Sequence, residues 1–157
     1  MAKKIVKQGK YTIKDSAKIV IKVRDLLGAG NLKLEIDNNN ETGGDAIREF
    51  VKRISKRTKI KKGKIVIDEL WKRMQQIDNY FFLAKDTEIK FKAKDLFKNE
   101  KIEVKANHFK QGVKIIARII ENKLKVNEGD ITIENPQKNI IEIEKPIEHP
   151  SLFGTKI

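Results

Sequence analysis

Apolar residues recur at helical spacing in three segments of the chain. The spacing predicts amphipathic helices over residues 44–57, 66–80 and 108–123. The first of these helices has the clearest boundary, because Thr42 followed three residues later by Asp45 is typical of a capping box. Many of its basic side chains fall in its last turns, where positive charge also suits the helix dipole.

Alternation of apolar and polar residues, typical of half-buried strands, is strict over residues 88–94 and 101–105 and predicts strands there. Similar short segments predict strands over residues 32–36, 130–134 and 140–144. A short polar turn separates residues 88–94 from residues 101–105, and another separates residues 130–134 from residues 140–144. The pattern therefore predicts two β-hairpins, with turns at residues 98–100 and 135–139.

Residues 16–27 fit two interpretations. Asp15 and Ser16 in front and Gly28 behind resemble helix caps, and a helix here would match the element order of a winged helix-turn-helix module. The alternation of Ile19, Ile21 and Val23 favours a strand instead. Because β-branched residues crowd this stretch, we favour the strand.

The strand interpretation reveals an internal repeat. Residues 18–27 and 32–36 and the helix from Asp45 then correspond to residues 88–97 and 101–104 and the helix from Phe109. Both copies have the order strand, turn, strand, helix.

These elements predict one compact α+β domain over residues 1–145, with a mostly antiparallel sheet and about three helices. Pro146, Pro150 and Gly154 predict an irregular C-terminal tail over residues 146–157.

Composition excludes several classes of protein. The absence of cysteine excludes a disulfide scaffold, a thiolate zinc site, an iron–sulfur cluster and a cysteine nucleophile. Apolar runs are far shorter than the ~20 residues of a membrane-spanning helix, and no apolar stretch follows the basic N-terminus as in a secretory signal. We therefore expect a location in the cytoplasm or in a virion, with no membrane partner.

Charge points to a class of partner. The chain has 35 basic and 22 acidic side chains, a formal charge of +13, and residues 52–64 hold eight cations and no acid. Compositional bias toward lysine would raise glutamate as well, so it explains the excess poorly. We therefore expect an anion-binding surface whose phosphate contacts come from Lys52, Arg53, Lys56, Arg57, Lys59, Lys61, Lys62 and Lys64, extended by Lys72 and Arg73.

The expected partner is nucleic acid, DNA or RNA. Lysine is a flexible point charge, so a lysine-rich surface predicts contacts to the phosphate backbone with little sequence preference. The leading hypothesis is a non-catalytic nucleic-acid-binding accessory protein of a phage, mobile element or ribonucleoprotein. The alternative is a structural subunit of a larger assembly or homo-oligomer, in which the acidic C-terminal block of one copy meets the basic surface of the next.

An enzymatic interpretation is a third hypothesis. Asp95 followed by Glu103 and Lys105 has the outline of a metal-dependent nuclease centre. Glu103 and Lys105 are also the solvent-facing positions of an ordinary strand, so we favour a protein that has no catalytic activity. His108 and His149 cannot form an ordinary structural zinc site without cysteine, and no cofactor or metal is expected.

Aromatic side chains could offer stacking platforms for single-stranded nucleic acid. Trp71, Tyr80 and Phe81 are the candidates. Trp71 lies at helical spacing within residues 66–80, and we therefore expect it in the core.

Overall fold

The computed structural model describes residues 4–36, 42–145 and 147–150. The strands are β1 (Lys4–Lys7), β2 (Gly9–Ile13), β3 (Lys18–Lys22), β4 (Lys33–Glu35), β5 (Met74–Ile77), β6 (Tyr80–Leu83), β7 (Glu88–Lys92), β8 (Glu103–Ala106), β9 (Ile131–Ile133), β10 (Ile140–Glu144) and β11 (Ile147–Pro150). The helices are α1 (Val23–Leu27), α2 (Gly43–Thr58), α3 (Ala93–Phe97), α4 (Phe109–Leu124) and α5 (Pro136–Asn139), with short 3-10 turns η1 (Ala29–Asn31), η3 (Lys62–Lys64) and η4 (Leu70–Lys72).

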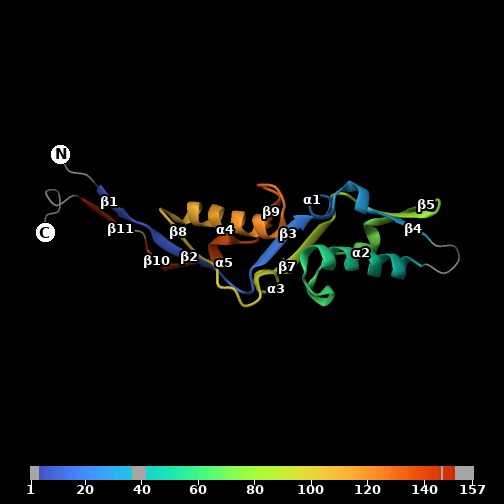
Figure 1. Cartoon of the computed structure of the whole chain (residues 1–157), viewed down its shortest axis with the longest axis horizontal. Helices are drawn as coiled ribbons and strands as arrows, with labels where there is room; N and C mark the ends of the chain where they lie inside the picture. The colour runs from blue at the N-terminus through green and yellow to red at the C-terminus, as the bar shows by residue number, and fades with distance from the viewer. Residues whose placement is uncertain (1–3, 37–41, 146, 151–157) are drawn as a thin grey trace.

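The described strands form antiparallel sheets, which confirms the predicted α+β fold. Their strand orders are β1-β11, β10-β2-β8, β7-β3-β9 and β4-β6-β5. The sheets follow one another along the long axis of the molecule, with α4 beside the end that holds β2 and β8 and α2 beside the end that holds β4 and β5 (Figure 1).

The two long helices confirm the first and third helix predictions. Both α2 and α4 bury one apolar face, and α2 begins with the predicted capping box between Thr42 and Asp45. Phe50 and Ile54 of α2 and Ile116 and Ile120 of α4 are fully buried. Burial of these stripes against the sheets stabilises both helices more than helix propensity does.

The predicted internal repeat is present. The segment β3–α1–β4–α2 is followed by β7–α3–β8–α4 in the same order. Both long helices have 16 residues and end before a lysine in the left-handed conformation, Lys59 with φ 62° and Lys125 with φ 58°. Further along, Glu69 and Asn135 again share this conformation, with φ 49° and 44°. These pairs are each separated by 66 residues, so the two copies match residue by residue in this region.

The repeats exchange strands. Strand β2 at the start of the first copy pairs with β8 and β10 of the second, and β6 at the start of the second copy pairs with β4 and β5 of the first. In the middle, β3 pairs with β7, with Val20 opposite Lys90. Because each copy completes the sheet of the other, neither copy contains its own full set of strand partners.

The predicted helix over residues 66–80 is wrong. This segment contains an isolated bridge at Val66, the turn η4 and strand β5, and it ends at the turn into β6. Asp78 lies in the turn with φ 52°. The β-forming run of Tyr80 and Phe81 follows at once and pairs with β5, so pairing overrides the helical spacing. Without this helix the winged helix-turn-helix alternative is excluded.

Both predicted hairpins are also wrong, although their strands exist. Strands β7 and β9 each pair with β3, whereas β8 and β10 each pair with β2. The turn predicted at residues 98–100 exists but follows the short helix α3, and most of the segment 135–139 forms the short helix α5. Residues 16–27 combine both interpretations, because the strand β3 leads directly into α1, which ends at Gly28. Residues 147–150, expected to be irregular, form β11.

Candidate nucleic-acid interface

A lysine-rich turn follows α2. This basic turn, residues 59–64, carries Lys59, Lys61, Lys62 and Lys64, all of them exposed. Ile60 between them is 1% exposed and anchors the turn in the core. The Lys59 N–H donates to the Ser55 carbonyl at 2.7 Å, and the Lys64 N–H donates to the Lys61 carbonyl at 2.9 Å. The backbone is therefore held while the four ammonium groups extend into solvent.

The cations of the basic turn differ from those of α2, where Arg48 pairs with Asp45 and Arg53 pairs with Glu49. Lys52, Lys56 and the four lysines of the turn form no ion pair with any residue that the structure describes. Arg53 differs, because its guanidinium donates to the carbonyls of Asn31 and Lys33 at 3.0 and 2.9 Å. Arg53 thus joins α2 to η1 and to the first residue of β4, which gives it a structural role.

A hollow of about 790 Å³ lies where the C-terminal ends of α2 and α4 meet the loop after α3. Its floor includes Leu96 and Phe97, which are buried. We call it the basic groove, and its cations are Lys56, Arg57, Lys59, Lys98, Lys123 and Lys125. The one carboxylate in its lining, Glu100, pairs with the Lys123 ammonium at 3.5 Å.

Some positive charge in the groove serves the fold. Each helix C-terminus carries about half a negative charge, and the groove receives two such ends. The Arg57 guanidinium donates to the carbonyl of Lys125 at 3.2 Å, which joins the end of α2 to the end of α4. Six cations still exceed the combined charge of two helix ends and one carboxylate, so the groove keeps a positive potential.

The second repeat contains a counterpart of the basic turn with opposite charge. Residues 125–130 follow α4 as residues 59–64 follow α2, and the Asp130 N–H donates to the Asn127 carbonyl at 3.1 Å, matching the bond of Lys64 to Lys61. The residues corresponding to Lys61, Lys62 and Lys64 are Asn127, Glu128 and Asp130. The equivalent turn of the second repeat thus forms without lysine at these positions, although Gly129 has φ 90° where Gly63 has no positive φ.

An ion pair of the second repeat is replaced by like charges in the first. Arg118 of α4 pairs with Glu128 at 3.9 Å. The corresponding residues of the first repeat are Lys52 and Lys62, both exposed. The first repeat thus has two cations at the positions where the second repeat has an ion pair, and the stability of the fold alone gives no reason for this exchange.

Three of the predicted site residues line the groove, and three lysines that line it were missed. Lys56, Arg57 and Lys59 were predicted, whereas Lys98, Lys123 and Lys125 lie far away in the sequence. The internal repeat was the available signal, because it aligns the end of α4 with the end of α2. Lys72 and Arg73 are exposed at and after η4, outside the groove lining, and Lys72 pairs with Glu69 at 3.2 Å.

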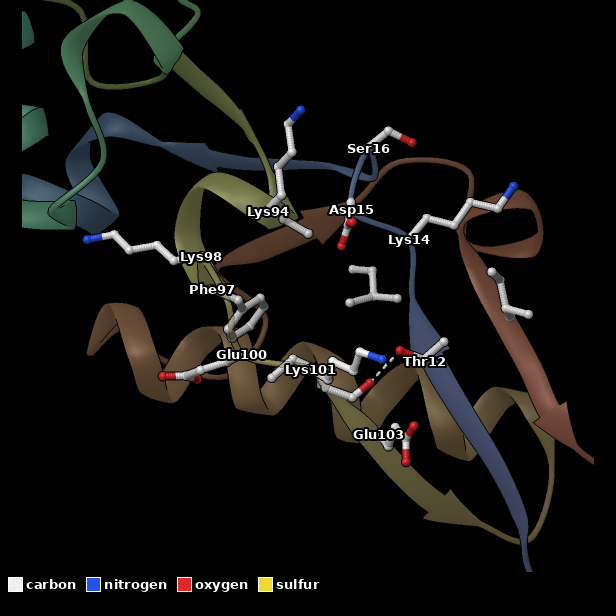
Figure 2. Close-up of a pocket in the computed structure, with 14 residues that line it drawn as sticks. Thr12, Lys14, Asp15, Ser16, Lys94, Phe97, Lys98, Glu100, Lys101 and Glu103 are labelled. Carbon is white, nitrogen blue, oxygen red and sulfur yellow. Dashed lines mark hydrogen bonds between the residues drawn. The ribbon is translucent and has the colours of Figure 1, made fainter.

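The residues of the nuclease hypothesis do not converge. Asp95 lines a hollow of about 340 Å³ with Lys64 and Lys90. Glu103 lines a different hollow of about 560 Å³, together with Asp15, from which the Lys94 and Lys98 side chains extend outward (Figure 2). Across the described part of the chain, no group of three or more histidine, aspartate or glutamate side chains is arranged to hold a metal ion.

Acidic residues of the C-terminal block contact lysines outside the basic turn. Glu144 pairs with Lys7 at 2.7 Å, and the hydrogen bond from Lys7 lowers the pKa of its carboxyl group. Glu134 lies 3.5 Å from Lys90, which also pairs with Asp68 at 3.4 Å. The hydrogen bond to Asp68 is the main reason that the pKa of Lys90 is raised. In the described residues, the basic turn is therefore not covered by this block.

Comparison of the chain with protein-family models, with curated proteins and with solved structures gives no match. Among the residues described, no helix has both the length and the apolar character needed to cross a membrane.

Proposed function

We propose that this protein binds nucleic acid without catalysis, through phosphate contacts along the basic groove and the basic turn. Lys59 belongs to both features, so the two form one surface. The observation that carries the proposal is the charge difference between equivalent turns, lysine at 61, 62 and 64 against Asn127, Glu128 and Asp130. A ligand with many negative charges accounts for lysines that the backbone does not need.

Phosphate backbones fit this surface for two reasons. Each lysine that neutralises a phosphate releases condensed counterions, which favours binding at low salt. Lys52, Lys56 and the lysines of the basic turn also lose little on binding, because they have no ion pair to break with any residue that the structure describes. Since lysine supplies a point charge and no planar fork for a base edge, we expect little sequence preference.

The test replaces the basic turn by the residues of its counterpart. The variant carries Lys61→Asn, Lys62→Glu and Lys64→Asp, the residues found at the equivalent positions of the second repeat. Binding to labelled duplex DNA, single-stranded DNA and RNA is measured by fluorescence anisotropy between about 50 and 200 mM salt. We expect weaker binding, with the slope of log affinity against log salt reduced by about 2 to 3.

A matched control removes the same formal charge from another exposed region. It carries Lys105→Glu, Lys110→Gln and Lys114→Glu on β8 and α4, away from the basic groove lining. The proposal requires a clearly smaller loss of affinity in this control than in the turn variant. Equal losses would mean that net charge alone drives binding. No binding of wild-type protein to any of the three nucleic acids at low salt would reject the proposal and favour a structural subunit that meets acidic protein surfaces.

A further inference from the structure

Trp71 is exposed, contrary to the prediction that it lies in the core. Its exposed fraction is 66%, the largest among the large apolar side chains of the described residues. The turn η4 explains why the Trp71 side chain points outward. The neighbouring Leu70 is buried, at 8% exposure, and anchors the turn in the core. The Arg73 N–H donates to the Leu70 carbonyl at 2.9 Å and closes it. The short closed turn therefore presents the indole to solvent.

The fold does not require an aromatic residue at this position. Glu69 and Asn135 share the left-handed conformation at the start of η4 and α5, so Trp71 corresponds to Gln137 in the second repeat. Gln137 is exposed as well. The same exposed position thus carries an indole in the repeat with the basic turn and a polar amide in the other.

Cations accompany the indole. The Lys72 Nζ lies 5.1 Å from the centroid of the Trp71 ring, and Arg73 beside it is exposed. Trp71 is seven positions after Lys64 of the basic turn, so at most about 24 Å of chain joins them. Aromatic side chains beside a row of cations are the combination that binds single-stranded nucleic acid, with bases on the rings and phosphates on the cations.

We infer that Trp71 is a base-stacking platform and that the preferred ligand is single-stranded nucleic acid. The inference rests on the proposed phosphate-binding function and adds the ligand class. In a duplex both faces of each base are already stacked on neighbours, whereas an unpaired base presents a free face to the indole. Lysines of the basic turn would hold the phosphates of the same strand.

The chain has one tryptophan, so its fluorescence reports on Trp71 alone. The probes are an oligothymidylate, an abasic oligonucleotide of equal length and charge, and a duplex of the same length. We expect the oligothymidylate to quench the emission strongly and the abasic strand to bind with little quenching. Trp71→Gln, which installs the counterpart residue, should weaken oligothymidylate binding about 5- to 150-fold and leave duplex binding unchanged.

Two variants complete the experiment. Trp71→Phe keeps an aromatic ring and should retain much of the affinity, while Ile77→Thr removes another exposed apolar side chain, 46% exposed, and should change nothing. Circular dichroism checks the fold of each variant. Binding of the oligothymidylate without any change in tryptophan emission would overturn the stacking role and leave phosphate binding intact. The same holds if Trp71→Gln loses as much affinity for the duplex as for the oligothymidylate. Absence of binding to every probe would overturn both proposals.

Discussion

The Arg57 guanidinium and the Lys125 carbonyl oxygen lie 3.2 Å apart and join the C-terminal ends of the two long helices. The two residues come from different repeats, so this hydrogen bond crosses from one copy to the other. It places a cation against the negative end of α4, where charge and hydrogen bonding act together.

Replacing Arg57 by alanine should therefore lower the free energy of unfolding, by about 1 kcal/mol, because a partly exposed charged hydrogen bond is lost. Urea unfolding followed by circular dichroism measures the change. Lys56→Ala is the control, since Lys56 is exposed and lines the same groove. It should alter stability by less than about 0.5 kcal/mol. Equal stability of both variants would contradict a structural role for the Arg57 bond.

Lys62→Glu should have opposite effects on stability and binding. It places a carboxylate at the position equivalent to Glu128, whose ion-pair partner Arg118 corresponds to Lys52. We expect stability to rise by up to about 1 kcal/mol, since exposed ion pairs contribute little. Affinity for nucleic acid should fall. Parallel urea and anisotropy measurements test this, and a variant that loses stability would show that Lys52 and Lys62 are not neighbours as the repeat implies.

Gly112 of α4 faces the ring of Tyr11 so closely that a Cβ there would lie 2.8 Å from the Tyr11 Cδ2 atom. Tyr11 is fully buried, and burial raises the pKa of its hydroxyl group. Gly112→Ala should therefore destabilise the protein by about 1 to 3 kcal/mol through overpacking, despite the better helix propensity of alanine. Gly63→Ala has open space around it and serves as the control. Equal melting temperatures of Gly112→Ala and Gly63→Ala in thermal unfolding would refute the close packing of Gly112 against Tyr11.

The capping box of α2 should make part of the stability depend on pH. The backbone N–H of Thr42 donates to the Asp45 carboxylate at 2.9 Å, and this bond, with Arg48 beside it, lowers the pKa of Asp45. A carboxyl whose pKa is lower in the folded state stabilises the fold above its unfolded pKa of about 3.9, and this contribution is lost as the pH falls through the folded value.

Asp45→Asn should consequently unfold at lower urea concentration than wild type at neutral pH, and the difference should shrink as the pH falls below about 4. Glu49→Gln, four residues further along α2, is a suitable comparison. A difference between wild type and Asp45→Asn that stays constant from neutral to acidic pH would show that the ionised carboxylate does not contribute.

The sequence by itself determined the elements whose cause is local. The apolar stripes of α2 and α4, the capping box at Thr42 and the alternation in β7 were sufficient to predict these elements, because burial of one face and hydrogen bonds between near neighbours produce them. For residues 16–27, which contain β3, the sequence was compatible with a strand and with a helix, and the internal repeat followed only from the strand. The density of cations in residues 52–64 was equally visible, as was the absence of cysteine chemistry.

The tertiary structure alone decided which strands pair and which distant residues meet. The turns after β7 and β9 suggested hairpins, yet the partners of these strands come from the other end of the chain, and strand exchange leaves no local signal. For the same reason Lys98, Lys123 and Lys125 joined the cations of α2 only in the folded chain. Trp71 faces solvent because backbone pairing turned residues 66–80 into a bridge, a turn and a strand, where helical spacing no longer determines which side chains are buried.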